Sequence, residues 1–422
     1  MQEIVLHQVQ KRGNAIKYSF SVSDELENYF SSEPFVVEYP ENVEAVPDAI
    51  AVIPFVSNVL PIIWLTDSTL RLKELDKAFY DCIPHVRGGF EKMFPESVFG
   101  GTIVVDSVVE CGVSVSEKSA TFFSGGLDAV HTLTRHLEEY PALISIWGSD
   151  IRFDNVDGWE IVHKGIAEYA EKYRLPDVVI RSSFRNFDNE RVLDEAFSKQ
   201  LKDGWWHGVK HGIGLLGHAA PYAYLHGVTT VYIASSNCPA DGHVRCSSNP
   251  LTDNHVRFAQ ASVVHDGFEC SRQDKVRDVV DYVKRTGDQV ALHVCWESQS
   301  GSNCCRCEKC YRTMAGLIAE GADPVDYGFS QTRNTMRNLQ RYLMTFYRES
   351  SILQRHWLHV QKSICKHQSE LTSHPDWKYI KWIVKADFQH PETLKRPMGI
   401  RERLSQYRFY QKLHELKVKL RG

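Results

Sequence analysis

The sequence of 422 residues predicts an α/β protein with a parallel sheet at its centre. From residue 120 onward, short β-branched apolar runs alternate with longer segments of helical periodicity. Strands separated by helices of that length build a parallel sheet with helices on both faces. Because the flanking regions have different patterns, we expect three domains: a mixed, β-rich α+β domain at 1–115, the parallel-sheet domain at 116–328, and a basic helical region at 329–422.

The first region carries short alternating runs that predict strands, with one segment of helical periodicity at 71–86. Its most apolar window, 49–65, approaches the length of a membrane span, but two prolines and two polar residues interrupt it. We interpret this window as two buried strands joined by a turn. The region contains no motif that indicates chemistry.

The central region predicts a regular alternation of strands and helices. The expected strands are 121–123, 142–148, 176–182, 229–236 and 290–295. The expected helices are a segment that ends near Glu139 and the segments 161–173, 212–227 and 275–285. In such sheets, ligands bind at the carboxyl ends of the strands.

The C-terminal region is aromatic and basic, with helical spacing that predicts two or three helices. From 331 to 422 there are 19 Lys+Arg and 7 Asp+Glu, a balance of +12, so the remaining 30 basic and 46 acidic residues give −16. A chain polarised in this way either docks its basic end on its own acidic body or offers it to an anionic partner such as nucleic acid.

Composition and cysteine use indicate the compartment. A hydrophobic content of 43% and a charged content of 24% are typical of a soluble globular protein, and the N-terminus shows no secretory signal. Eleven cysteines without such a signal favour a reducing compartment over a disulfide framework. We therefore expect a cytoplasmic protein that does not enter a membrane.

The stretch TFFSGGLD places a glycine turn between a predicted strand and a predicted helix. Gly125 and Gly126 remove the Cβ atoms that keep a backbone away from an anion, and Ser124 adds a hydroxyl donor. With Leu127 and Asp128, these residues open a helix whose positive dipole end attracts phosphate. Asp128 would hold magnesium or order the loop, and the alternative is a plain strand-to-helix turn.

A second glycine string, HGIGLLGH, matches the GxGxxG pattern of dinucleotide-binding proteins at Gly212, Gly214 and Gly217. Such a site needs a strand directly before the glycines, and the preceding LKDGWWHGVKH does not predict one. We interpret these glycines as positions where a helix packs closely on the sheet or, at Gly212, approaches a bound nucleotide.

Four cysteines, Cys295, Cys304, Cys307 and Cys310, have the spacing C-x8-C-x2-C-x2-C. Four thiolates that close two short loops suit tetrahedral zinc, although an iron–sulfur cluster takes the same four ligands. Cys305 is then either a spare ligand or a thiol that points outward.

The glycine turn SGGLDA resembles the SGGxDS loop of the PP-loop ATP pyrophosphatases, which have the HUP-type parallel-sheet fold, with Ala129 in place of the final serine. Together with the cysteine spacing, it resembles the 7-cyano-7-deazaguanine synthase family over roughly residues 120 to 321. SRQDKV resembles that family's phosphate-contacting segment. The resemblance implies a catalytic set of Ser124, Asp128, Arg272 and Lys275, and an adenine site near Trp147 and Gly148.

The resemblance implies an enzyme that uses ATP and Mg²⁺ to adenylate a carboxylate or amide, which ammonia or an amine then attacks, with structural Zn²⁺. Because the N-terminal region and basic tail have no counterpart in the compact synthase, we expect a paralogue, of the kind found in bacterial defence or specialised modification pathways. Its acceptor would be a small molecule or a protein, and its assembly a homo-oligomer or a complex with a protein partner. Polar residues near predicted strand ends are the expected acceptor contacts: Asn237, Asp241, Arg245, Asp253 and His265.

Two other functions fit the same features. A PP-loop tRNA thiolase would use the basic tail to bind RNA and the cysteines to hold an iron–sulfur cluster or carry sulfur. A zinc-stabilised nucleic-acid-binding protein would retain the loop without its chemistry, as the Ala129 substitution also suggests.

Overall fold

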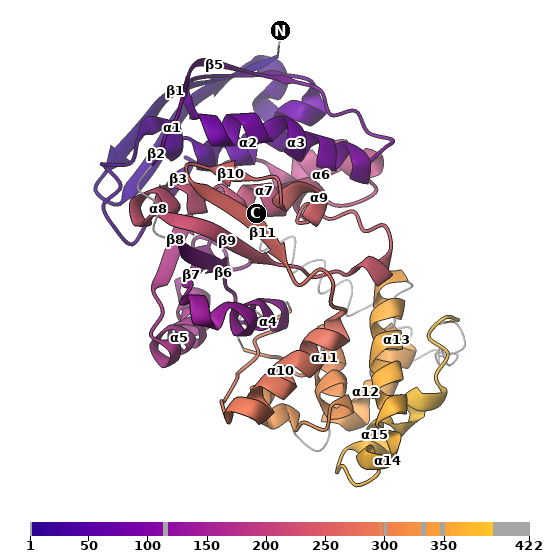
Figure 1. Ribbon diagram of the computed structural model, residues 1–422. Helices are drawn as coiled ribbons and strands as arrows, with labels where there is room; N and C mark the ends of the chain where they lie inside the picture. Colours follow the sequence, from indigo (N-terminus) through magenta and orange to yellow (C-terminus); the bar gives the residue numbers. More distant parts are fainter. Residues whose placement is uncertain are drawn as a thin grey trace. The chain divides into compact units, whose positions relative to one another are not determined.

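Eleven strands form one mixed, mostly parallel sheet in the computed structural model, which describes residues 2–112, 117–295, 297–298, 302–330, 335–346 and 351–390 (Figure 1). The strand order is β10-β11-β9-β6-β7-β8-β3-β2-β1-β4-β5. The strands are β1 (Glu3–Arg12), β2 (Ala15–Val22), β3 (Val36–Glu38), β4 (Thr69–Asp76), β5 (Thr102–Val109), β6 (Lys118–Phe122), β7 (Ala142–Trp147), β8 (Asp177–Ser182), β9 (Val228–Ala234), β10 (Arg257–Phe258) and β11 (Ala261–Asp266).

The prediction of an α/β protein with a mostly parallel sheet is confirmed. Strands β11, β9, β6, β7 and β8 are neighbours that run parallel to one another. The chain passes from β6 to β7 and β8 on one side, and then returns to β9 and β11 on the other side of β6. The strand order therefore reverses at β6, and open α/β sheets bind ligands at such a switch point.

The helices of the first 304 residues cover this sheet. They are α1 (Asp48–Ala51), α2 (Ile53–Thr66), α3 (Lys77–Met93), α4 (Leu127–His136), α5 (Val156–Tyr173), α6 (Glu190–Leu201), α7 (His211–Leu216), α8 (Ala219–His226), α9 (Pro250–Asp253) and α10 (Arg272–Thr286). Helices α4 and α5 lie on one side of the parallel strands, and α7 and α8 lie on the other (Figure 1). Right-handed crossovers, the rule for parallel strands, would place the helices in this way on either side of β6.

The N-terminal strands continue the same sheet. Val37 of β3 pairs antiparallel with Ser182 of β8, which joins β1–β5 to the parallel strands. The chain has two compact units, Met1–Cys304 with Asp326–Phe329, and Cys305–Val325 with Ser330–Gly422. The domain boundaries that we expect at 115/116 and 328/329 remain predictions.

The interpretation of 49–65 as two strands is wrong, because this window forms helices α1 and α2. Twelve residues of α2 are buried, from Ile53 to Trp64, so the segment shows no polar face from which helical periodicity could be read. Periodicity cannot separate a buried helix from a buried strand. Pro54 lies in the first turn of α2, where its missing N–H costs nothing, whereas Pro61 lies inside the helix.

Two further elements differ from prediction. The segment 71–86 is not a single helix: Thr69–Asp76 is strand β4, and α3 begins only at Lys77, where Asp76 Oδ2 accepts from Phe79 N at 3.1 Å as an N-cap. The strand expected at 290–295 is wrong, because the structure has no strand there. The N–H groups of this segment donate to three separate acceptors: Leu292 N to Tyr327 O at 3.0 Å, His293 N to Gly125 O at 2.7 Å, and Val294 N to Asn303 Oδ1 at 3.0 Å.

The described part of the C-terminal unit is helical, and it includes helices within the predicted helical region 329–422. Its helices are α11 (Glu308–Ala319), α12 (Thr335–Phe346), α13 (Ser351–Lys366), α14 (Gln368–Leu371) and α15 (Trp377–Ile380). Trp357 of α13 is fully buried, and its Nε1 donates to Glu308 Oε1 of α11 at 2.9 Å, which ties the two helices together. The helix expected at 400–420 lies outside the described residues.

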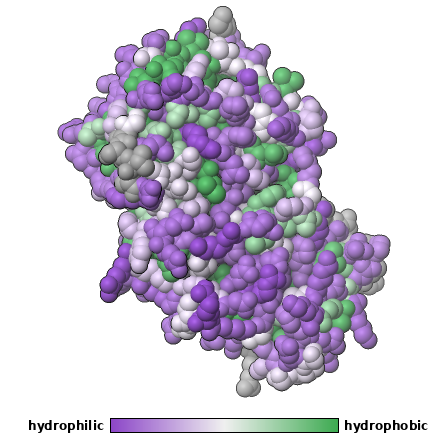
Figure 2. Space-filling model, viewed as in Figure 1, coloured by the Kyte–Doolittle hydropathy of each residue, from purple (hydrophilic) through white to green (hydrophobic). Residues whose placement is uncertain are grey.

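Two features bear on what surrounds the chain: the length of its helices and an apolar part of its surface. In the described ranges, no helix is both long and apolar enough to cross a membrane. Figure 2 shows apolar residues gathered where Figure 1 draws β1 and β5 at the end of the sheet. β5 is an edge strand, and its Val108 is exposed.

Candidate functional site

The glycine turn lies at the carboxyl end of β6, the strand at which the sheet order reverses. Gly125 has φ +71°, a left-handed conformation that favours glycine. Gly126 has φ −72° and ψ 164° and is the N-cap of α4, so the helix begins directly at the turn. The sequence places two glycines here because the backbone must turn sharply from strand to helix.

Backbone N–H groups of this turn form no hydrogen bond within the described part of the chain. No described residue accepts a hydrogen bond from the N–H groups of Gly125, Gly126 or Leu127. On the other side of the turn, Gly125 O accepts from His293 N, so a neighbouring segment holds the loop through its carbonyl. Free N–H groups at a helix N-terminus are the elements of an anion site.

Three of the four expected catalytic side chains meet at this turn. Arg272 Nη1 lies 2.8 Å from Asp128 Oδ2, and Lys275 Nζ lies 3.5 Å from Asp128 Oδ1. Arg272 and Lys275 come from the first turn of α10, and Asp128 from the first turn of α4. Ser124, the fourth, is exposed at the end of β6. Two helix N-termini and two cations therefore converge on one edge of the sheet.

Helix α10 begins here because Ser271 caps it. Ser271 Oγ accepts from Asp274 N at 3.2 Å, and Asp274 Oδ2 accepts from Ser271 N at 3.0 Å, which together form a capping box. Lys275 Nζ also donates to Ser235 O, just beyond the end of β9. Lys275 thus links the ends of the two strands that flank the switch point.

The expected adenine site lies at the end of the next strand. Gly148 has φ +115°, and a Cβ there would lie 1.8 Å from Ser182 O, so only glycine fits. The Trp147 ring stacks on Trp159 with centroids 5.5 Å apart, and the Arg181 guanidinium lies 4.5 Å from it on a face. Trp147 is therefore held rigidly beside the strand end, although no ligand contact tests its role.

Gly212 lets helix α7 pack closely against the backbone of Ser247 in the structure. A Cβ on Gly212 would lie 2.3 Å from Ser247 O, and Gly212 N donates to Ser247 Oγ at 2.6 Å. Gly214 and Gly217 likewise allow close approach to Asn58 and Ser57 of α2. The segment before α7 is a π-helix, Trp206–Lys210, and not the strand that a dinucleotide site requires.

The five expected acceptor contacts lie in different surroundings. Asn237 is half-buried just after β9, and buried Asp241 accepts from Cys238 N at 2.8 Å. Arg245 pairs with Glu96 at 2.5 Å. Asp253 and His265 do meet, because Asp253 Oδ2 lies 2.8 Å from His265 Nδ1 in the protein interior. These contacts to protein groups occupy Asp241, Arg245, Asp253 and His265, and their role toward a substrate stays a prediction.

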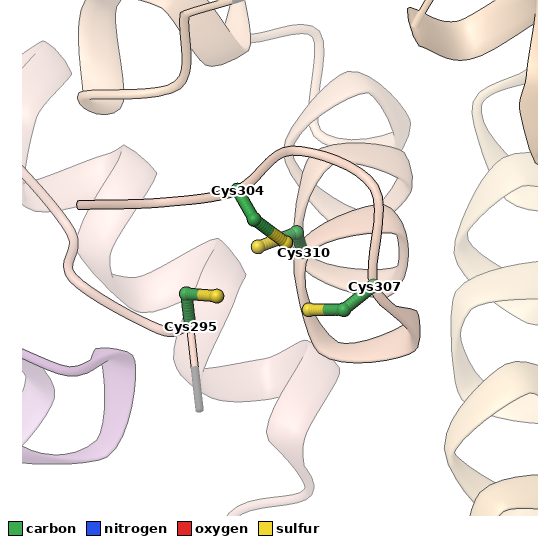
Figure 3. A group of neighbouring side chains, drawn as sticks. All are labelled: Cys295, Cys304, Cys307 and Cys310. Carbon is green, nitrogen blue, oxygen red and sulfur yellow. The ribbon is translucent and has the colours of Figure 1, made fainter. Parts of the chain in front are cut away.

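The four cysteines of the C-x8-C-x2-C-x2-C motif converge. All four Sγ atoms lie within 4.8 Å of one another, and Figure 3 shows their side chains pointing toward a common centre. Four sulfurs around a tetrahedral zinc with bonds near 2.3 Å lie about 3.8 Å apart, so a small contraction completes the site. The cluster could therefore bind a metal such as zinc, and Cys307 and Cys310 are fully buried.

Local hydrogen bonds hold the four cysteines in this arrangement. Asn303 Oδ1 accepts from Val294 N at 3.0 Å and its Nδ2 donates to Leu292 O at 2.7 Å, which holds Cys304 beside the segment that carries Cys295. Cys307 is the N-cap of α11 and Cys310 lies in its first turn. Cys305 has φ +53°, is buried, and its Sγ lies 3.8 Å from Ser330 Oγ, so it does not point outward.

A cavity of about 590 Å³ lies beside α4 and α10, beyond their first turns. His131, Cys270 and Asp278 line it with ligand atoms within 4.8 Å of one another. The glycine turn does not contribute to its lining, so this cavity is separate from the candidate phosphate site.

Comparison of the chain with family models, curated proteins and solved structures finds no match. The assignment of a function therefore depends on the residues and geometry of the chain itself.

One chemically notable group was not predicted from the sequence: Asp203, His207, His211 and Cys246. The signal was the H-x3-H spacing of His207 and His211, which places two imidazoles near each other on one helical segment. Cys246 was not singled out because a scattered cysteine is usually a small buried hydrophobe.

Proposed function

We propose that the chain is a PP-loop ATP pyrophosphatase that adenylates a carboxylate or amide acceptor, releases pyrophosphate, and passes the acyl group to ammonia or an amine. One observation carries the proposal. Asp128, Arg272 and Lys275 meet at a glycine turn with available N–H groups, at the switch point of a parallel sheet. The resemblance of SGGLDA to the PP-loop adds to this support.

Backbone and side-chain groups of the site have different roles in this proposal. The N–H groups from Gly125 to Leu127 and the dipole of α4 bind the leaving pyrophosphate, as preorganised donors do for developing charge. Arg272 and Lys275 neutralise its negative charge from α10. Asp128 positions both cations, since each of its carboxylate oxygens faces one of them. Mg²⁺, when bound, would neutralise further phosphate charge, and Asp128 is the carboxylate of this group that would hold it.

The four cysteines serve a structural role in this proposal. Cys295, Cys304, Cys307 and Cys310 leave no open coordination position on a tetrahedral metal, as in structural zinc sites. An iron–sulfur cluster would fit the same thiolates, but the adenylation chemistry does not need one. Metal content and colour of the purified protein separate these two cases.

The test measures pyrophosphate and AMP released from ATP, with ammonium and the carboxylate that the resembled deazaguanine enzymes use as the first acceptor. Arg272→Gln is the probing variant and Arg277→Gln its matched control, because Arg277 lies on the same helix but its side chain is 41% exposed. We expect Arg272→Gln to lower the rate about 100-fold, as the loss of one transition-state donor does. Arg277→Gln should change it less than about twofold.

The acceptor is a separate question from the phosphate chemistry. If the first acceptor fails, hydroxylamine in a cell extract traps the acyl adenylate of the natural one. Pyrophosphate release that is equal in wild type and Arg272→Gln would refute the proposed site.

A further inference from the structure

A group of acid, imidazole and thiol side chains lies outside the proposed phosphate site. His207 belongs to the π-helical turn Trp206–Lys210, and His211 begins α7. Asp203 precedes this turn, and Cys246 lies in the loop before α9. Short π-helical segments are rare and occur frequently at functional sites.

The acid and the first imidazole are held in a fixed orientation. Asp203 Oδ2 lies 2.6 Å from His207 Nδ1, and Asp203 Oδ1 accepts from Gly204 N at 2.7 Å. With Nδ1 occupied by the carboxylate, Nε2 is the ring nitrogen available to the Cys246 thiol. A carboxylate that orients a histidine beside a nucleophile is the arrangement of catalytic triads.

The loop that carries the thiol is fastened to the same helix. Ser247 N donates to His207 O at 2.9 Å, and Ser247 Oγ accepts from Gly212 N at 2.6 Å. Gly212 is required for this contact, since a Cβ there would lie 2.3 Å from Ser247 O. The glycine that the sequence suggested for nucleotide binding therefore brings Cys246 up to the histidines.

The surroundings of Cys246 favour its thiolate form. Burial alone would raise the pKa of this thiol, but hydrogen bonds with His207 and His211 outweigh it and lower the pKa to about 6. The bond to Asp203 and then the bond to Cys246 raise the pKa of His207 to about 10. Asp150 adds a further carboxylate that faces His211. The pair is therefore a thiolate and an imidazolium at neutral pH.

Another cysteine provides an internal contrast. Cys82 of α3 is as buried as Cys246, each being 4% exposed. Burial raises the pKa of Cys82 to about 12, and the Arg257 guanidinium and backbone contacts offset this only in part. The difference between these two thiols arises from the imidazoles and not from depth in the protein.

We propose that Asp203, His207 and Cys246 form a thiol acyl-transfer centre, whose substrate is an acyl group carried on nitrogen or oxygen, such as an amide. This is an activity beyond the ATP chemistry, and it needs no nucleotide. The centre also lies near the end of β7 through a series of contacts: Arg185 Nη1 donates to Ser149 O at 3.1 Å, Arg185 lies 4.0 Å over the Trp206 ring, and Trp206 packs on His211 at 5.5 Å.

The reaction balances with water as the only co-reactant. Cys246 Sγ forms a bond to the carbonyl carbon, the C–N bond of the amide breaks, and the His207 imidazolium gives its proton to the leaving nitrogen. Water then adds to the thioester carbon and gives a proton to neutral His207. The S–C bond breaks, which restores the thiolate and the imidazolium and leaves a carboxylic acid and free ammonia or amine. Such a step would supply the nitrogen that the proposed amidation consumes.

The test uses the full chain without ATP and p-nitrophenyl acetate as the acyl probe. We expect a burst of one equivalent of p-nitrophenolate at pH 7, with a hydroxylamine-labile acetyl group on Cys246 by mass spectrometry. Cys246→Ser should lose the burst, and Cys82→Ser should keep it. His207→Asn should slow acylation at least about tenfold at pH 7, and the difference should shrink above about pH 9, where a thiolate forms without the imidazole.

Labelling of wild-type protein keeps the test independent of whether each variant folds. Iodoacetamide should modify Cys246 with a midpoint near the pKa of about 6 and leave Cys82 unmodified at pH 7. Equal rates at the two cysteines, or wild-type protein whose Cys246 stays unmodified by both reagents, would overturn the proposal. Because Arg272→Gln should retain the burst, failure of the thiol centre and failure of the ATP site are distinguishable.

Discussion

Lys275 carries an ammonium group into the protein interior, where it meets Asp128 and the carbonyl of Ser235. A buried cation without its partner is costly, about 3–5 kcal/mol when one member of a buried pair is removed. Asp128→Ala would therefore lower stability together with activity, and a loss of activity alone would not assign its role. Arg272 lies nearer the surface of the same group, which makes it the better residue to substitute.

Cys305 shows how one residue carries local strain. It adopts φ +53°, a conformation that costs a residue with a Cβ roughly 1 kcal/mol relative to glycine. The conformation favours glycine, and Cys305 bears the cost of adopting it.

A buried histidine predicts acid sensitivity. His218 Nδ1 lies 2.7 Å from Gly214 O and Nε2 lies 2.8 Å from Ser182 Oγ, which suits the neutral ring. Burial, with a smaller effect of Lys210, lowers the pKa of His218 from 6.5 to about 4. The unfolded chain therefore binds a proton that the folded chain does not, and the free energy of unfolding falls by about 3 kcal/mol from this group as the pH drops from 6.5 to 4.

Urea unfolding at pH 7.5 and 5.0 measures this effect. His218→Gln should be less stable at pH 7.5 but lose less stability on acidification, whereas His7→Gln, at an exposed position of β1, should retain the wild-type loss. The same acid loss in wild type and His218→Gln would contradict the assignment.

At the scale of elements, helix α7 depends on Gly212 for its position. A Cβ there would meet backbone at 2.3 Å, so Gly212→Ala should destabilise the protein by about 1–3 kcal/mol. Gly165→Ala in α5 is the matched control, since nothing lies within 4 Å of its Cβ and alanine favours a helix by about 0.5–1 kcal/mol. Thermal unfolding should give a lower melting temperature for Gly212→Ala and a higher one for Gly165→Ala, relative to wild type. Equal shifts in the two variants would show that this contact does not hold α7.

Periodicity predicted two kinds of element well: helices with one polar face, and short strands bounded by turn residues. Helix α5 and strand β8 follow this rule, with alternating or one-sided burial. Helix α2 does not, because burial on all sides removes the pattern that identifies a helix. The segment 290–295 has a strand-like composition, yet its N–H groups donate to Tyr327, Gly125 and Asn303 and not to a neighbouring strand. Only the tertiary structure determines these partners.

At the scale of the whole molecule, the sequence suffices to predict the glycine turn and the cysteine cluster, since both are local in the chain. Arg272 and Lys275 were predicted as phosphate-contacting residues only through the resemblance of SRQDKV. Their contacts with Asp128 were not predicted, because α10 is far from α4 in sequence. The Cys246 group brings together Asp203 and His207 with a distant loop. Single-sequence patterns do not contain that information.

The metal cluster makes a prediction for the stability of the chain. We expect one zinc per chain in a colourless protein, and Cys307→Ser should lower the free energy of unfolding by at least about 3 kcal/mol, because metal binding energy is folding energy. Cys365→Ser, at an exposed position of α13, should leave both zinc content and stability unchanged. Thermal unfolding with and without a chelator checks this, and full stability without metal would refute a structural site.

Calorimetric titration with Mg·ATP tests the central claim most directly, with the isosteric variants Gly126→Asp and Gly126→Asn. Gly126 has φ −72°, which any residue adopts, and a Cβ there would meet neighbours no closer than 3.4 Å, so both variants should fold. If the turn holds the polyphosphate, wild type binds Mg·ATP, Gly126→Asn binds it more weakly, and the added charge of Gly126→Asp abolishes binding. Folded wild-type protein that binds no ATP, or variants that bind it equally well, would contradict the account.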